Sequence, residues 1–201
     1  DRLRKEYPDC KLYCFDSARM SGAFGLLTIH AHLMQRDGKT FDEVIRWLEE
    51  NKFRVHQMGP IDDLIFVARR GRLTMGKAIM GSFAGVKPMG DCNAEGYTTV
   101  LTKVKGIGKA LDLTAEYVKA TAVDPTDQII LIAHSDRELY ANTLKTKIME
   151  SLSPKEVWVT DVFCGCGANV GPGMVGVYYL GEKVSEDLVS EKMIMSELQG
   201  K

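Results

Sequence analysis

The stretch that decides the fold lies near the C-terminus and reads "TDVFCGCGANVGPGMVGVYYLG", residues 160–181. A pair of cysteines, Cys164 and Cys166, stands in a glycine-rich segment that also contains Pro172. The run that follows, 174–181, is rich in β-branched and aromatic residues and predicts a strand. Glycines before a strand predict a loop whose backbone closely approaches another group. The first question is therefore what this loop holds.

A metal is the first candidate, because the chain has five cysteines: Cys10, Cys14, Cys92, Cys164 and Cys166. Structural zinc normally takes pairs of cysteines that are separated by two to four residues. C-x-C is tighter than that, no second pair has the required spacing, and the redox motif C-x-x-C is absent. We therefore interpret the cysteines as reduced thiols of a cytoplasmic protein, with a metal or redox module as an alternative.

Composition narrows the classes of partner. The chain has 201 residues, of which 45% are hydrophobic and 26% charged, and its net charge is −1. Without a basic excess to neutralise phosphates, a nucleic-acid partner is not expected. No apolar run reaches the roughly 18 residues of a transmembrane helix, and no signal peptide is expected at the N-terminus. Because the chain starts without methionine, on what reads as the end of a helix, we expect further sequence before Asp1.

Hydrophobic periodicity predicts an α/β fold with a mixed sheet. Strands are expected at 10–17, 53–59, 127–135, 156–163 and 174–181, and a hairpin is expected around 92–96. Helices are expected at 21–39, 40–52, 62–72, 73–85, 106–122, 136–151 and 182–201. Thr40 and Glu43 form a capping-box pattern at the start of the second of these helices. We predict that residues 1–52 are the remnant of an N-terminal α/β domain with linking helices, and that 53–201 are a C-terminal α/β domain.

One basic segment, 67–78, has two interpretations. Four cations lie within nine residues: Arg69, Arg70, Arg72 and Lys77. They either complement the C-terminal end of a helix or bind a carboxylate or phosphate. The segment continues into adaptable apolar residues, Met75, Ile79, Met80 and Phe83, and a cation beside flexible apolar surface suits an amphiphile.

Other polar positions carry weaker signals. The turn at 105–109, K-G-I-G-K, offers backbone N–H groups to an anion but lacks the dinucleotide and P-loop fingerprints. His134 ends a predicted buried strand, and the favoured interpretation is a hydrogen-bonded structural histidine. No Ser-His-Asp set, paired catalytic carboxylates or nucleophile elbow is recognisable, so the sequence does not predict catalysis by this chain alone.

Four segments, in order along 10–181, together resemble the DegV family of bacterial fatty-acid-binding proteins. "FDSARMSGAFGLL" resembles its D-S/T-x-x-x-S-x-G-x-G-L-L junction, and "GPIDDLIFVARRGRLTMGKAIMGSFAGVKPM" resembles its D-D-L-x-x-L-x-x-G-G-R-I segment. "TKVKGIGKAL" resembles V-R-G-x-K-K-A-L, and "GCGANVGPGMVGVYY" resembles G-x-H-x-G-P-G-x-x-G-x-x-F. Two departures stand out. The family's N-terminal domain begins earlier than this chain does, and Asn169 stands where the family has histidine.

The resemblance implies two α/β domains with a long-chain fatty acid between them, no cofactor and no metal. It also implies a lipid carrier that presents the acyl carboxylate to a separate fatty-acid kinase subunit, which catalyses the phosphorylation. We predict that four residues lie near the carboxylate: Asn169, Arg72, Ser17 and Ser21. We predict that four more contact the acyl tail: Met75, Ile79, Phe83 and Met89. The rival hypothesis is an enzyme that binds a phosphorylated or acyl substrate through Arg69, Arg70, Arg72 and the 105–109 turn.

Overall fold

The centre of the molecule is a four-stranded mixed sheet. The computed structural model describes residues 1–71 and 75–200, apart from the side chains of residues 77 and 78. The strands are β1 (Val55–Met58), β4 (Ile129–His134), β5 (Glu156–Asp161) and β6 (Val175–Leu180), in the order β1-β6-β4-β5. β6 runs antiparallel to β1 and β4, whereas β5 runs parallel to β4. The predicted α/β class with a mixed sheet is thus confirmed.

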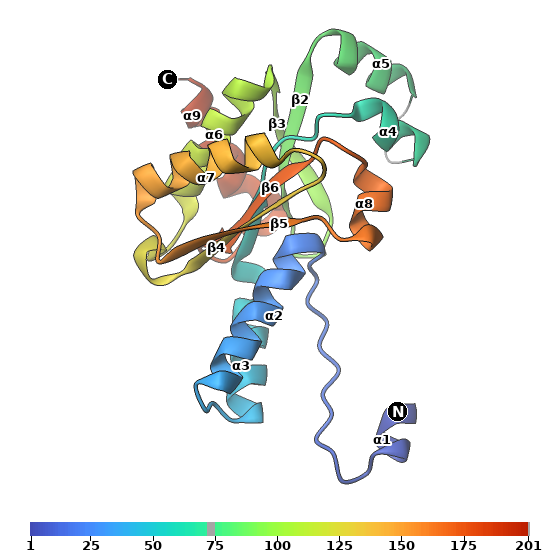
Figure 1. Ribbon diagram of the computed structural model, residues 1–201, viewed down its shortest axis with the longest axis vertical. Helices are drawn as coiled ribbons and strands as arrows, with labels where there is room; N and C mark the ends of the chain where they lie inside the picture. Colours follow the sequence, from blue (N-terminus) through green and yellow to red (C-terminus); the bar gives the residue numbers. More distant parts are fainter. Residues whose placement is uncertain (72–74, 201) are drawn as a thin grey trace.

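Helices cover both faces of this sheet, which explains why β4 is buried along its whole length. Ile130 and Ile132 belong to the core on the side of α6 (Ile107–Thr121) and α7 (Glu138–Leu152). Leu131 and Ala133 point to the opposite face, where α2 (Ser21–Arg36) packs. Figure 1 shows α6 and α7 on one side of the sheet and α2 reaching it from below. Successive residues of a strand point to opposite faces, so a continuous apolar run marks a strand buried on both.

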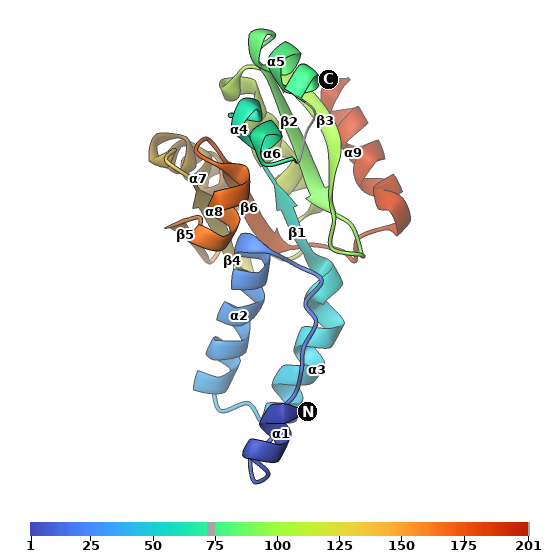
Figure 2. The same cartoon turned by 90° about the vertical axis from the view of Figure 1, so that its right-hand side faces the viewer.

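The predicted hairpin is confirmed as a separate two-stranded ribbon. β2 (Val86–Cys92) and β3 (Thr98–Lys105) pair antiparallel, with an irregularity between Met89 and Gly90. The C-terminal helix α9 (Val189–Gln199) packs against β3 and α6, as Figure 2 shows. Short 3-10 turns occur at Lys52–Arg54, Pro125–Asp127 and Glu186–Leu188.

α2 and α3 (Phe41–Asn51) form an arm that extends from the sheet (Figures 1 and 2). The capping box at the start of α3 is confirmed: the Thr40 hydroxyl accepts from the Glu43 N–H, and the Glu43 carboxylate accepts from the Thr40 N–H. No helix of the described residues is long and apolar enough to cross a lipid bilayer.

The predicted strand at 10–17 was wrong. After the short helix α1 (Arg2–Glu6), the chain runs extended beside α3 without any strand pairing. Side chains hold it there: the Tyr13 hydroxyl donates to Glu49 over 2.7 Å, and the Lys52 ammonium donates to the Asp16 carbonyl over 3.3 Å. A strand needs the backbone groups of a neighbouring strand, and a helix offers only side chains.

The loop predicted around the two cysteines was also wrong, because Cys164–Val170 is a short helix, α8. It ends at Gly171, whose positive φ of +69° glycine adopts at little cost because it has no Cβ atom. Two further helices, α4 (Leu64–Arg69) and α5 (Met75–Phe83), precede β2, and α4 packs against α8. Asp63 begins α4 by accepting a hydrogen bond from the Phe66 N–H.

Candidate functional site

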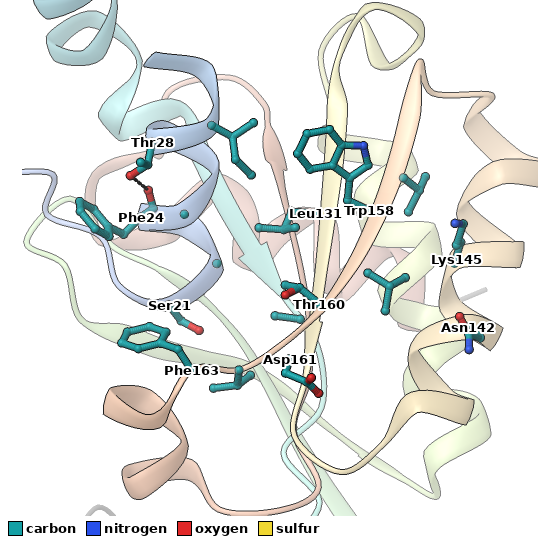
Figure 3. Close-up of a pocket in the computed structure, with 17 residues that line it drawn as sticks. Ser21, Phe24, Thr28, Leu131, Asn142, Lys145, Trp158, Thr160, Asp161 and Phe163 are labelled. Carbon is teal, nitrogen blue, oxygen red and sulfur yellow. Dashed lines mark hydrogen bonds between the residues drawn. The ribbon is translucent and has the colours of Figure 1, made fainter. Parts of the chain in front are cut away.

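An open groove of about 920 Å³ lies between α2 and β5, one of the two edge strands of the four-stranded sheet. Figure 3 shows its lining: Ser21, Phe24 and Thr28 come from α2, and Trp158, Thr160 and Asp161 come from β5. Leu131 of β4 contributes to the floor, and Asn142 and Lys145 of α7 lie on the far side of β5. The groove thus joins an apolar floor to a few polar groups, the usual composition of a small-molecule site.

Three aromatic side chains of the groove remain accessible. Phe24 is 48% exposed, Trp158 38% and Phe163 58%. Because β5 has a neighbouring strand on one side only, and α2 covers only part of the sheet face, these rings are not sealed into the core. Exposed aromatic side chains that gather in one hollow indicate a surface that binds an apolar group.

Ser21 stands at one end of the groove, where α2 begins. Its backbone has a φ of +51°, and its hydroxyl accepts a hydrogen bond from the Tyr178 hydroxyl over 3.3 Å. The Tyr178 ring fills the space next to Gly22, where a Cβ atom would come within 2.3 Å of the ring. Burial raises the pKa of Tyr178 to about 12, so its hydroxyl stays protonated and donates to Ser21. The start of α2 is therefore fixed onto β6.

Charged side chains gather beyond the carboxyl ends of β1 and β4. Asp62, which follows β1, forms ion pairs with Lys87 of β2 and with Arg137, whose Nη2 lies 3.2 Å from its carboxylate. Burial by itself raises the pKa of Asp62, but the hydrogen bonds and charges of Lys87 and Arg137 outweigh it and lower the pKa below its ordinary value. Asp62 is thus a carboxylate that connects three segments.

His134 ends β4 and lies next to the last residue of β5. Its ring is buried, its Nδ1 accepts from the Arg137 N–H over 3.4 Å, and the Asp161 carboxylate lies 3.8 Å away. This is the structural role that the sequence favoured. Ligands of α/β proteins commonly bind at the carboxyl ends of strands, and Asp161 also lines the groove, so the charged edge and the groove are continuous.

The predicted carboxylate-binding residues lie in different places. Ser21 lines the groove, whereas Ser17 is buried and its hydroxyl donates to the carbonyl of Arg19. Asn169 is partly buried in α8, where its amide donates to the Gly165 carbonyl over 3.0 Å. Arg72 lies outside the described residues. Of the described residues in this predicted set, only Ser21 lines the groove.

The predicted tail-binding residues form two groups. Met75, Ile79 and Phe83 lie on α5 and are exposed, Phe83 by 90%. Met89 is 1% exposed and belongs to the core between the hairpin and the sheet. Arg69 and Arg70 are exposed at the end of α4. The described cations of the basic segment therefore lie at a surface and not in the groove, whereas the Arg72 and Lys77 side chains lie outside the described part of the chain.

Sequence reasoning missed the aromatic residues of the groove. Trp158 alternates with Val157 and Val159, which pack toward α7, so the period of two in β5 already places the tryptophan on the opposite face. Phe24 carries no such signal, because its exposure depends on where α2 crosses the sheet. In the described part of the chain, no three His, Cys, Asp or Glu side chains cluster as a metal site would require.

The family model described as "Uncharacterised protein, DegV family" matches residues 1–182. The chain belongs to the DegV family. A DegV domain-containing protein of Clostridium perfringens, CPE0026, is 32% identical over 182 residues, which cover 90% of this chain and 62% of that relative. The chain thus spans less than two thirds of the length of this DegV relative.

Solved DegV structures share the fold. The fatty acid binding DegV family protein SAG1342 from Streptococcus agalactiae superimposes with a TM-score of 0.71 at 26% identity, over 90% of this chain and 64% of that one. The Streptococcus pneumoniae Fatty Acid Kinase (Fak) B3 protein, loaded with linoleic acid, gives a TM-score of 0.77 at 18% identity, over 90% and 64%. The second likeness concerns the fold alone.

Proposed function

We propose that this chain is part of a DegV-type carrier that binds a long-chain fatty acid, with at least part of the acyl tail in the groove between α2 and β5. The observation that carries the proposal is the apolar groove of about 920 Å³ with its three accessible aromatic side chains, in a chain of the DegV family. The groove volume lies within the range of about 300–1,000 Å³ that is usual for ligand sites.

Burial of the tail supplies the affinity. Each methylene removed from water contributes about 0.8 kcal/mol, so even part of a long acyl chain offsets the cost of immobilising it. Leu131, Trp158 and Phe24 offer the apolar surface that such a chain requires. No polar partner is needed along the tail, which agrees with the scarcity of charged side chains on the groove floor.

A few polar groups then orient the carboxylate. Ser21 supports this role because Tyr178 holds its hydroxyl at one end of the groove. Asn169, in the position of the family's histidine, offers an amide that does not titrate near neutral pH. Ser17 and Arg72 complete the predicted set.

The proposed carrier does not catalyse a reaction itself. It presents the carboxylate to a separate kinase subunit, in the cytoplasm, without a cofactor of its own. The linoleic acid in the Fak B3 protein supports this proposal by analogy of fold. The rival anion-binding enzyme lacks a specific observation in its favour, since Arg69 and Arg70 are exposed and do not line the groove.

The test compares two lysine substitutions in delipidated protein. Trp158→Lys places a charge inside the groove and should weaken palmitate binding at least tenfold, because the ammonium cannot be buried beside the tail. Leu139→Lys is the matched control, since Leu139 is 75% exposed on α7 and does not line the groove. Titration calorimetry measures both affinities. If the parent chain binds no palmitate, or if both variants bind like the parent, the proposal fails.

A further inference from the structure

Residues 171–174 form a turn between α8 and β6, and one side chain from another element, Ser135, holds it. The Ser135 hydroxyl donates to the Gly171 carbonyl over 2.5 Å and accepts from the Met174 N–H over 3.1 Å. Its backbone N–H donates to the Met174 carbonyl over 3.0 Å, and its carbonyl accepts from the Gly173 N–H over 2.7 Å. Every hydrogen-bonding group of Ser135 is thus directed at this turn.

The same turn is packed so closely that it has little room to move. Gly171 and Gly173 have φ values of +69° and +102°. A Cβ atom on Gly171 would lie 2.3 Å from the Phe66 ring, and one on Gly173 would lie 2.8 Å from Cβ of Asp62. The backbone N–H of Asp62 also donates to the Gly173 carbonyl over 3.1 Å. Packing against α4 and Asp62 limits where the turn lies, and Ser135 fixes its orientation.

α8 depends on this turn for its own position. It has seven residues, and helices this short are not stable in isolation, so tertiary contacts set its direction. Its last turn closes through the Gly171 N–H, which donates to the Gly167 carbonyl over 2.8 Å. Asn169 lies two residues before Gly171, so a shift of Gly171 changes the direction of the Asn169 side chain.

We propose that Ser135 is a positioning residue for carboxylate recognition: by fixing the Gly171–Met174 turn, it sets the direction in which Asn169 meets the ligand. This inference rests on the proposed function, because it assumes a fatty acid whose carboxylate approaches α8. Ser135 does not contact the ligand. Its hydroxyl contributes to headgroup affinity and has no effect on the acyl tail.

The experiment compares palmitic acid with 1-hexadecanol, which has the same tail without a carboxylate. Titration calorimetry gives both affinities for the parent chain, Ser135→Ala and Ser135→Thr. We expect Ser135→Ala to reduce the acid-to-alcohol affinity ratio roughly fivefold to tenfold, since a misplaced hydrogen bond to the carboxylate keeps only part of its strength. Ser135→Thr keeps the hydroxyl and should restore most of the ratio. Ser151→Ala is the matched control, because that hydroxyl bonds the Lys147 and Ile148 carbonyls of its own helix.

The outcomes separate the two proposals. If the parent chain binds neither ligand, the proposed function fails and the inference with it. If the parent binds both and Ser135→Ala weakens both equally, or leaves the ratio unchanged, Ser135 has only a structural role and the inference is overturned. Should Ser135→Ala not fold, as thermal unfolding would reveal, Ser135→Cys is compared on the same ratio, because its thiol is a weaker donor.

Discussion

Two carboxylates attach the β2–β3 hairpin to the central sheet, and their surroundings differ. The Asp91 side chain is 0% exposed and accepts from His56 Nδ1 over 2.6 Å, from the N–H groups of Gln57 and Cys92, and from the Tyr117 hydroxyl. The Asp62 side chain is 22% exposed, and its partners Lys87 and Arg137 are 14% and 30% exposed. One cluster lies in the dry interior, whereas the other lies at the edge beside the candidate site.

This difference gives the two clusters different roles: the buried one stabilises the fold, and the exposed one positions the turn beside the candidate site. In a dry interior, an unpaired polar group is expensive, so the Asp91 network tolerates no missing member. At the edge, water can replace a lost partner. The Asp62 cluster therefore fixes the position of the neighbouring turn but contributes little to the free energy of unfolding. The pKa of His56 in the buried cluster is raised, whereas the pKa of Asp62 is lowered, which makes the two clusters separable by experiment.

The largest effect is expected from Asp91→Ala. It leaves the His56 ring, the Tyr117 hydroxyl and two backbone N–H groups without their acceptor, at a cost of about 3–5 kcal/mol in the free energy of unfolding. Urea unfolding measures the loss. Asp112→Ala is the control, because Asp112 is 55% exposed in its pair with Lys147 and should cost about 0.5 kcal/mol or less. Equal losses in the two variants would abolish the contrast between buried and exposed carboxylates.

A smaller effect follows from His56 and depends on pH. Burial alone lowers the pKa of His56, but the charge and the hydrogen bond of Asp91 outweigh it, so the pKa is raised; the Glu182 carbonyl and Glu191 act in the same direction. The Arg19 guanidinium and the hydroxyls of Tyr117 and Tyr179 also belong to this neighbourhood.

The sign follows from the raised pKa. His56 stabilises the fold fully below its unfolded pKa of about 6.5, and this contribution is lost as the pH rises through the folded pKa. His56→Gln should therefore cost roughly 2 kcal/mol at pH 6 and less at alkaline pH. Urea unfolding of both proteins between pH 6 and pH 9 measures the difference. A cost that grows with pH would contradict the charged His56–Asp91 pair.

The smallest effect is expected from Asp62→Asn. The pKa of Asp62 is lowered, so its contribution is present above the unfolded pKa and is lost as the pH falls through the folded pKa, the reverse of His56. We expect a cost of about 1 kcal/mol at pH 7, reduced by salt. Thermal unfolding measures this cost with and without sodium chloride at about 0.5 M, a concentration that screens ion pairs at the surface. If Asp62→Asn lowered the free energy of unfolding as much as Asp91→Ala does, the expected difference between the exposed and the buried cluster would be wrong.

Much of the fold was predictable because it rests on local signals. The capping box at Thr40 and Glu43, the hairpin around 92–96 and the continuous apolar run of β4 all lie where the sequence places them. Each depends on residues that are neighbours in the chain, so the signal survives without knowledge of the fold. The family was predictable for another reason: its motifs are spread along 10–181 and match jointly.

The predictions were wrong where contacts with a distant segment of the chain determine the local structure. Residues 10–17 have strand-like composition, but they lie beside a helix and pair with no strand. The glycine-rich segment at 164–170 reads as a loop, yet contacts with α4 and the Gly171 turn make it helical. Among the described members of the predicted site, only Ser21 lies in the groove. The groove forms because α2, β4 and β5 lie next to one another in space, and no sequence pattern shows this.

The sequence alone thus determined the α/β class, the order of most of the elements and the family, since these depend on periodicity and on motifs at fixed positions. Only the tertiary structure placed His56 and Asp91 in one dry network, separated by 35 positions in the chain, and left Trp158 half exposed at the edge of the sheet. It also decided that Ser135 holds the turn at residues 171–174, where the "CGCGANVGPG" stretch ends. Burial and hydrogen bonding across distant segments are properties of the packed chain, and they set both the stability of this protein and the geometry of its groove.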